Sequence, residues 1–322
     1  MGMQRTALVA LTAAITLAQQ QEELPTIKVD VDIVNILCTV RDKNGALIPN
    51  LQKDDFVVKE DGREQTIRYF ARETDLPLTI GLLVDVSPSQ RNLIETERRT
   101  ASQFFSSVLR PKDMAFLISF GPEVEQLQDY TNSTKLLNQG LDELRPLGPA
   151  VGIQPGPVPT ISQPRGTVLF DAVYLAANEK LKGEVGRKAI VIITDGVDTG
   201  SHVKLAEALE AAHKADSIIY SIYYVDPSAY YGSGGFYYPN DSDLKKMSEE
   251  TGGRLFRVDK KNPLNKIFDQ IQEEMRSQYS IGYTPANATR DGSFRRLDVK
   301  TNRKDLKTQN RKGYYASAPD KA

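Results

Sequence analysis

Five almost continuously apolar runs, separated by amphipathic segments, constrain the fold of this chain more than any other feature. The runs are LTIGLLVD, MAFLISF, KAIVIITD, SIIYSIYYV and the shorter GRLFRV, and all of them lie between residues 77 and 276. Strands that are apolar on both sides are typical of a parallel sheet covered by helices on both faces. One intervening segment has a clear helical stripe, formed by Leu264, Ile267, Phe268, Ile271 and Met275. We therefore predict an α/β fold with a doubly wound, mostly parallel sheet.

Strand patterns return on both sides of this region. Residues 26–74 contain alternating apolar positions and the turn signal Asp61-Gly62, which predicts a hairpin between FVVKE and EQTIRYF. Residues 277–316 contain SQYSIGYT, SFRRLDVKT and GYYA. Neither flank has enough strands to cover its own apolar faces. We therefore expect the two flanks to form one small β-sandwich-like domain, with the α/β domain of residues 77–276 inserted between them.

The N-terminus has the pattern of a targeting segment. Arg5 precedes the apolar run TALVALTAAITLA, which ends at Ala18 before QQQEEL. This pattern predicts that residues 1–18 are a secretory signal peptide, so that the mature chain is secreted, periplasmic or on the cell surface. The run is short for a transmembrane helix, and no span is predicted in the mature chain. A buried helix and an uncleaved anchor are the alternative interpretations.

Composition excludes several classes of partner and site. The formal net charge of −1 and the pI of about 6.2 provide no overall field for a nucleic acid, so no nucleic-acid partner is predicted. Two His make a multi-His metal site improbable, so a metal would depend on oxygen ligands. Cys38 is the single cysteine and falls on the apolar face of a predicted strand, where we expect it to be buried.

Oxygen-bearing residues follow the predicted parallel strands at the points where they end. Asp85, Ser87 and Ser89 follow the first strand, and Asp195 follows AIVIIT. Thr167 opens a helix after a stretch rich in Gly and Pro. Ligands of open parallel sheets bind at this edge, and Mg²⁺ prefers six oxygen ligands. As an alternative, the two serines cap the following helix and Asp195-Gly196 forms a simple turn.

These three segments resemble the metal-ion-dependent adhesion site (MIDAS) of von Willebrand factor type A (VWA) domains and integrin inserted domains. The family pattern is Asp-x-Ser-x-Ser after the first strand, a Thr from a second loop and an Asp after a later strand. The resemblance implies a site for Mg²⁺, or for Mn²⁺ or Ca²⁺, whose ligands are Asp85, Ser87, Ser89, Thr167 and Asp195. Pro88 replaces a frequent Gly, which stiffens the loop without removing a ligand.

The flanks extend this resemblance over nearly the whole mature chain. DFVVKEDGREQTIRYF ahead of the domain, and YSIGYTP, DGSFRRLDVKT and RKGYYA behind it, are similar to the VWFA-related proteins of acidobacterial type. The resemblance of the flanks implies an exported protein. The resemblance of the site implies that the carboxylate of a partner binds the cation, and we therefore expect an exported, non-enzymatic module that uses a divalent cation to bind an acidic group of a protein partner. A structural subunit of an envelope assembly is the alternative. A secreted hydrolase using Ser87 or Ser89 is disfavoured, because no Gly-x-Ser-x-Gly or His-Glu-x-x-His motif is present.

Two further segments have more than one interpretation. The loop of residues 226–240 is rich in aromatic side chains, which either contact the partner or pack back onto the domain: Tyr230, Tyr231, Phe236, Tyr237 and Tyr238. Residues 295–312 carry eight Lys and Arg against two Asp. We interpret this run as the solvated edge of strands, and binding to an anionic surface is the alternative.

Overall fold

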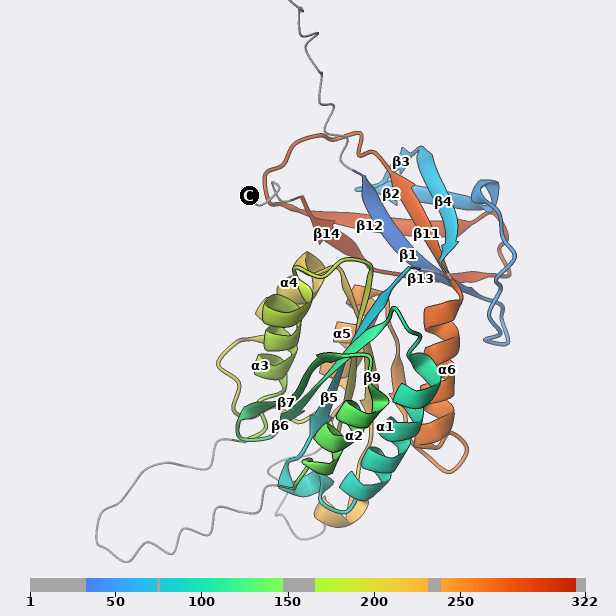
Figure 1. The fold of residues 1–322 in the computed structure, drawn as a ribbon. Coiled ribbons are helices and arrows are strands. Elements are labelled where there is room, and N and C mark those ends of the chain that lie inside the picture. Colours follow the sequence, from blue (N-terminus) through green and yellow to red (C-terminus); the bar gives the residue numbers. More distant parts are fainter. Residues whose placement is uncertain (1–32, 74–75, 147–165, 231–238, 317–322) are drawn as a thin grey trace, which may run out of the picture. The chain divides into compact units, whose positions relative to one another are not determined.

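The computed structural model describes residues 33–73, 76–146, 166–230 and 239–316 (Figure 1). All of these residues belong to one compact unit of the chain. The predicted signal peptide, residues 1–18, lies outside the described residues. Among the residues that are described, no helix has the length and apolar character needed to cross a membrane.

The centre of the α/β domain is a six-stranded sheet with the strand order β10-β9-β8-β5-β6-β7. Its strands are β5 (Leu78–Asp85), β6 (Met114–Phe120), β7 (Val124–Thr131), β8 (Arg187–Thr194), β9 (Ser217–Tyr223) and β10 (Leu255–Arg257). All neighbours pair in parallel except β7, which is antiparallel to β6. Every residue of β5 and β8 is buried, as expected of strands covered on both faces. The predicted mostly parallel sheet is confirmed.

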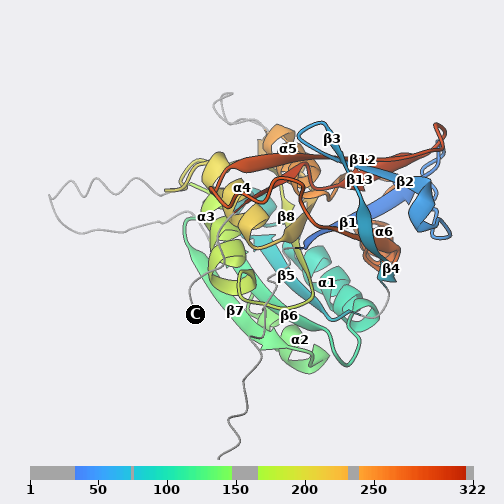
Figure 2. The same ribbon diagram turned by 90° about the horizontal axis from the view of Figure 1, so that it is seen from above.

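Helices cover both faces of this sheet (Figures 1 and 2). One face packs against α1 (Ile94–Val108), α2 (Thr134–Asp142) and α6 (Leu264–Arg276). The other packs against α3 (Leu169–Tyr174), its π-helical continuation η3 (Leu175–Leu181), α4 (Leu205–Lys214) and α5 (Ser242–Thr251). This arrangement is the doubly wound layering that the sequence predicts.

Eight further strands form two four-stranded sheets, with the orders β13-β1-β11-β4 and β14-β12-β2-β3. The strands are β1 (Val34–Arg41), β2 (Phe56–Glu60), β3 (Arg63–Gln65), β4 (Ile67–Glu73), β11 (Gln278–Tyr283), β12 (Phe294–Thr301), β13 (Lys307–Asn310) and β14 (Gly313–Tyr315). β1 pairs with β11 and β2 pairs with β12, so strands from both flanks share each sheet. Both sheets contribute to one apolar core. The predicted β-sandwich-like domain with an inserted α/β domain is therefore confirmed as the fold class.

The turn at Asp61 and Gly62 differs in part from its prediction. Both residues have positive φ, 47° and 81°, which suits a tight hairpin between β2 and β3. β3 ends at Gln65, however, and β4 crosses to the other sheet to pair with β11. The predicted single partner strand EQTIRYF is therefore divided between the two sheets.

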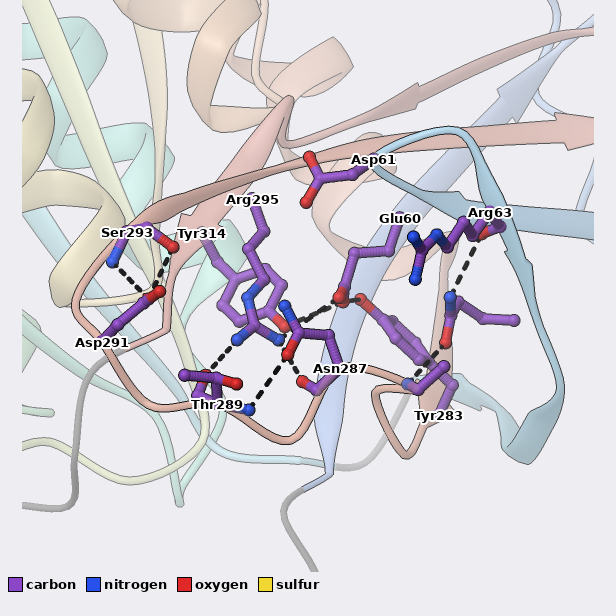
Figure 3. A network of polar contacts seen from close by, with 12 residues as sticks. Glu60, Asp61, Arg63, Tyr283, Asn287, Thr289, Asp291, Ser293, Arg295 and Tyr314 are labelled. Carbon is purple, nitrogen blue, oxygen red and sulfur yellow. Dashed lines mark hydrogen bonds and ion pairs between the residues drawn. The ribbon is translucent and has the colours of Figure 1, made fainter.

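A buried polar network joins strands of both flanks inside the β-domain (Figure 3). Glu60 of β2 accepts hydrogen bonds from the hydroxyls of Tyr283 (2.5 Å) and Tyr314 (2.8 Å). Arg295 of β12 forms an ion pair with Glu60 at 3.3 Å, and each side chain is 3% exposed. Arg295 also donates to main-chain carbonyls at residues 287 and 289. Because the carboxylate of Glu60 and both terminal nitrogens of Arg295 have partners, most of the cost of burying this network is offset, and Nε of Arg295 is left without a hydrogen-bond partner among the described residues.

One buried arginine side chain contacts both points at which the chain crosses between the β-domain and the α/β domain. Arg187 of β8 donates to the carbonyl of Leu76, where the chain enters the α/β domain, and to that of Met275, where it leaves. The two crossings therefore lie close together, as an inserted domain requires.

Cys38 is fully buried in the β-domain core, as predicted, and this burial raises the pKa of its thiol to about 12.

Candidate metal site

The loop after β5 holds the first group of predicted ligands. Asp85 is the last residue of β5 and is fully buried. Its carboxylate accepts a hydrogen bond from the main-chain N–H of Ser87 at 2.9 Å. The N–H of Val86 donates to the carbonyl of Phe120 at 2.8 Å, which aligns this loop with the end of β6. Parallel pairing therefore places Asp85 at the carboxyl edge of the sheet, where ligands of such sheets bind.

The two serines of the motif do not cap a helix in this structure. Ser87 precedes the short helix η2 (Pro88–Gln90) without a side-chain capping bond, and α1 begins only after Leu93. The hydroxyls of Ser87 and Ser89 instead lie 3.0 Å apart. Pro88 at the first position of η2 is tolerated because the N–H of that position needs no helical partner. The capping alternative is therefore not what the loop adopts.

Asp195 follows β8 and completes a connected cluster. The hydroxyl of Ser89 donates to Oδ2 of Asp195 at 2.5 Å. The hydroxyl of Thr194 donates to Oδ2 of Asp85 at 2.5 Å. Gly196 has a φ of 80°, and a Cβ there would lie 2.2 Å from the carbonyl oxygen of Asn240, so the turn after Asp195 requires glycine. Four of the five predicted ligands are thus joined by hydrogen bonds across the ends of β5 and β8.

Thr167, the fifth predicted ligand, is held by its backbone. Its carbonyl accepts hydrogen bonds from the N–H groups of Thr199 (3.0 Å) and Gly200 (3.2 Å) in the loop after β8. The next N–H, of Val168, donates to the carbonyl of Gly121 after β6 at 2.8 Å. Thr167 therefore lies at the same edge of the sheet as the cluster. Its hydroxyl forms no hydrogen bond with the other four predicted ligands in the part of the chain that the structure describes.

The charges of the site repel one another. Burial and then the charge of Asp195 raise the pKa of Asp85, and hydrogen bonds from Ser87 and Thr194 offset part of that rise. A third carboxyl group, that of Glu97 on α1, is fully buried. Within the described residues neither of its oxygens has a hydrogen-bond partner. Burial and then the charges of Asp85 and Asp195 raise the pKa of Glu97 well above its usual range.

This donor set fits a small divalent cation. A cation between Asp85 and Asp195 removes the repulsion that raises the pKa of Asp85. Neighbouring ligand oxygens around an octahedral Mg²⁺ are about 3 Å apart, since each Mg–O bond is about 2.1 Å. The hydroxyl oxygens of Ser87 and Ser89 already have this spacing, at 3.0 Å. No group of three His, Cys, Asp or Glu within the described ranges could hold a metal, so a cation bound here would also need hydroxyl or water ligands.

An aromatic side chain also contacts the cluster. Tyr230 ends the short helix η4 (Pro227–Tyr230), and its hydroxyl donates to Oδ2 of Asp195 at 2.5 Å. The structure therefore places Tyr230, one of the aromatic residues predicted either to contact a partner or to pack onto the domain, beside the hydrogen-bonded cluster. The other predicted aromatic residues lie outside the described residues: Tyr231, Phe236, Tyr237 and Tyr238.

The sequence interpretation missed Thr194 and Glu97. Thr194 was available as the last residue of the strand that precedes Asp195, where its hydroxyl holds Asp85. The signal for Glu97 was its place on the apolar stripe of α1, beside Ile94 and Ala101, both of which are buried. A carboxylate on such a stripe is rarely buried without a partner, so its position indicated a special environment.

The two histidines have partners elsewhere. The Nδ1 atom of His202 lies 2.9 Å from Asp171, which also accepts hydrogen bonds from the main-chain N–H groups of His202 and Val203. His213 packs against the rings of Phe294 and Tyr315. Neither set of contacts includes Ser87 or Ser89, the serines that a hydrolase would need to activate.

Comparison with models of protein families and with curated proteins found no match. Among solved structures, the chain is similar to proximal thread matrix protein 1 from the mussel byssus, a structure described with a zinc-occupied MIDAS motif. The TM-score is 0.50 and the identity 14%, and the match covers 67% of this chain and 49% of that chain. The α/β domain has a VWA-like fold.

Two other solved structures are similar to the VWA-like chain. BatB from Bacteroides thetaiotaomicron has a TM-score of 0.46 and 20% identity, covering 62% of this chain and 97% of that one. A von Willebrand factor type A protein from Catenulispora acidiphila has a TM-score of 0.47 and 10% identity, covering 89% and 63%. At such identities the likeness concerns the fold.

Proposed function

We propose that this chain is an exported, non-enzymatic binding module that holds a divalent cation at the edge of its VWA-like domain. The ligands are Asp85, Ser87, Ser89, Thr167 and Asp195, and the cation is Mg²⁺, with Mn²⁺ or Ca²⁺ as substitutes. The observation that supports this most strongly is the hydrogen-bonded cluster of two carboxylates and two serine hydroxyls. The zinc-occupied MIDAS motif named for the similar mussel protein supports the use of a divalent metal.

Some groups of the cluster orient a carboxylate, and others provide neutral oxygens. The hydroxyl of Thr194 and the N–H of Ser87 hold both oxygens of Asp85, which fixes the direction of that carboxylate. The hydroxyls of Ser87 and Ser89 provide oxygen without adding negative charge. Ser89 is partly exposed, so the cluster is accessible from the edge of the sheet. When bound, the cation supplies the positive charge that attracts an acidic partner group.

The small number of charged ligands favours an acidic partner. The residues proposed to hold the cation include two carboxylates, those of Asp85 and Asp195, and three neutral hydroxyls. Burial, and then the charges of Asp85 and Asp195, raise the pKa of Glu97 well above its usual range, which opposes the ionisation of a third carboxyl group beside them. A partner group that carries a carboxylate can then approach without strong repulsion.

Metal-dependent capture of a partner tests this function. The purified mature chain is immobilised and exposed to native envelope extract in Mg²⁺ or in EDTA, beside the variants Asp85→Ala and Asp129→Asn. Asp129 is a suitable control because its partner is Lys180, away from the cluster. We expect captured proteins that require Mg²⁺, are lost with Asp85→Ala and remain with Asp129→Asn. Capture that is equal in EDTA would favour a structural subunit and contradict the proposal.

A further inference from the structure

A second feature of the molecule, separate from the metal cluster, is a groove between two sheet edges. Its volume is about 660 Å³. One wall contains β13, an edge strand of the β-domain, and the other contains β10, an edge strand of the six-stranded sheet, with Lys245 and Glu249 of α5. In the strand order of that sheet, β8 and then β5 lie beyond β9, so neither strand that carries the metal cluster borders the groove. No predicted metal ligand is among the lining residues described.

The lining of this groove is strongly basic. Seven Lys and Arg side chains line it, against two acidic ones, Asp42 and Glu249. The whole chain has a formal net charge of −1, so this is a local concentration of positive charge and no reflection of composition. Clefts lined by one sign of charge focus the field and attract ligands of the opposite sign. The charge therefore indicates an anionic ligand.

Part of this positive charge is neutralised by acidic side chains that form ion pairs with the arginines of the groove. Glu274 of α6 is fully buried and forms ion pairs with Arg41 and with Arg254, the latter at 3.2 Å. Arg257 pairs with Asp241 at 2.5 Å. These pairs fix the arginines and leave their charges partly neutralised.

The lysines of the groove are different. Lys43, Lys307 and Lys312 are exposed and form no ion pair among the residues that the structure describes. Lys245 has a single, long contact with Glu249 at 3.9 Å. Their positive charges are therefore available to a ligand in the groove, and they surround it from the β-domain and from α5.

The walls also have the geometry that an extended chain uses. The carbonyl of Arg254 accepts a hydrogen bond from the main-chain N–H of Ser221, and the N–H of Val258 donates to the carbonyl of Tyr223. Along β10 and its ends, alternate residues therefore form their main-chain hydrogen bonds with β9. The main-chain groups of Leu255 and the N–H of Arg257 are consequently directed to the other side of β10, where the carbonyl of Arg257 accepts a hydrogen bond from Nδ2 of Asn262 at 3.4 Å. Extended peptides bind such edges through main-chain hydrogen bonds. The described lining residues include no aromatic side chain on which a nucleic-acid base could stack.

We propose that this groove binds an acidic peptide segment in an extended conformation, as a site independent of the metal cluster. The segment lies between β10 and β13, and its carboxylates contact Lys307 and Lys312 on one side. This inference goes beyond the metal-dependent function and does not rest on it. Because acidic groups are also the proposed ligands of the metal, the two sites are separated by measuring peptide binding in EDTA.

The test is fluorescence anisotropy with a labelled peptide of alternating Glu and Thr, in EDTA and at low salt. We expect binding that weakens as salt is added, and that falls about tenfold or more in the double variant Lys307→Glu/Lys312→Glu. The matched control is Lys135→Glu/Lys260→Glu, which reverses two exposed lysines outside the groove and should bind like the parent. Circular dichroism establishes that both double variants are folded.

Two further peptides decide the class of ligand. A peptide of alternating Gln and Thr should not bind, because it lacks charge. A Glu/Thr peptide with proline at alternate Thr positions should bind about tenfold more weakly, because proline lacks the N–H that pairs with a strand edge. The proposal is overturned if the two double variants bind the Glu/Thr peptide equally. It is also overturned if the Gln/Thr peptide binds the parent as tightly as the Glu/Thr peptide does. Equal binding of the proline peptide, with tighter competition by heparin, would replace the peptide with a sulfated polysaccharide and also overturn it.

Discussion

The buried pair of Glu60 and Arg295 should contribute far more to stability than an exposed pair on the same strand. The two charges are 3.3 Å apart and each is 3% exposed, so their attraction is about 5 kcal/mol at an effective dielectric constant of about 20. Arg295→Met leaves Glu60 buried with two tyrosine hydroxyls and no cation. We expect this change to lower the free energy of unfolding of the β-domain by about 3–5 kcal/mol.

The matched control is the pair of Asp298 and Lys300, also on β12. Their charged atoms are 2.7 Å apart, closer than those of the buried pair, but the side chains are 51% and 71% exposed. Water and salt screen such a pair, so Lys300→Met should cost less than about 1 kcal/mol. If distance alone determined the contribution, the control would cost more than Arg295→Met.

Thiol labelling of Cys38 in a urea series measures this difference in the β-domain itself. Cys38 is fully buried in the core shared by both sheets, and burial raises the pKa of its thiol to about 12, so labelling requires opening of the domain. We expect the labelling transition of Arg295→Met to move to much lower urea, while that of Lys300→Met stays near the parent. Equal shifts for the two variants would refute the assignment of stability to burial.

Three further outcomes are expected. Deletion of residues 277–322 should make labelling of Cys38 fast while the α/β domain stays folded, because β1 then loses its partner strands β11 and β13; slow labelling would contradict the shared domain. Burial, and then the charge of Arg311, lower the pKa of His213 to about 4, so stability is complete above about pH 6.5 and falls by up to about 3 kcal/mol as pH decreases to 4; His213→Phe should flatten this profile in urea melts. Tyr230→Phe removes the donor to Asp195 and should tighten Mg²⁺ binding a few-fold in calorimetry, because the metal no longer competes for that oxygen, and weaker binding would instead make Tyr230 a supporting residue.

The elements that the sequence predicts best are those in which one physical requirement dominates. β5 and β8 are buried along their whole length, so their apolar runs leave no other interpretation. β7 was not predicted as a strand, because it is an edge strand whose residues VEQLQDYT are mostly partly exposed and polar. β4 was predicted to continue the hairpin, but tertiary pairing with β11 moves it to the other sheet.

The candidate site also contains residues that the sequence predicts and residues that it does not. Asp85, Ser87, Ser89 and Asp195 follow strand ends, and the parallel register brings them together in the structure. The spacing of α1 places Glu97 on its apolar stripe and so indicates a special environment, but spacing does not show that this part of α1 lies close to Asp85 and Asp195. The place of Thr167 depends on a loop contact with residues 199 and 200, which is a long-range feature. Local patterns thus predict the strand-end ligands, and long-range packing decides the groups around them.

Isothermal titration calorimetry of the purified chain with MgCl₂ and MnCl₂ tests the central claim most directly. We expect one site, which is lost in Asp85→Ala and in Ser89→Ala while circular dichroism shows both variants folded. Asp129→Asn should bind the metal like the parent, since its carboxylate pairs with Lys180 and not with the cluster. Metal binding that is unchanged in Asp85→Ala, or absent from the parent, would contradict a metal site at this edge of the sheet.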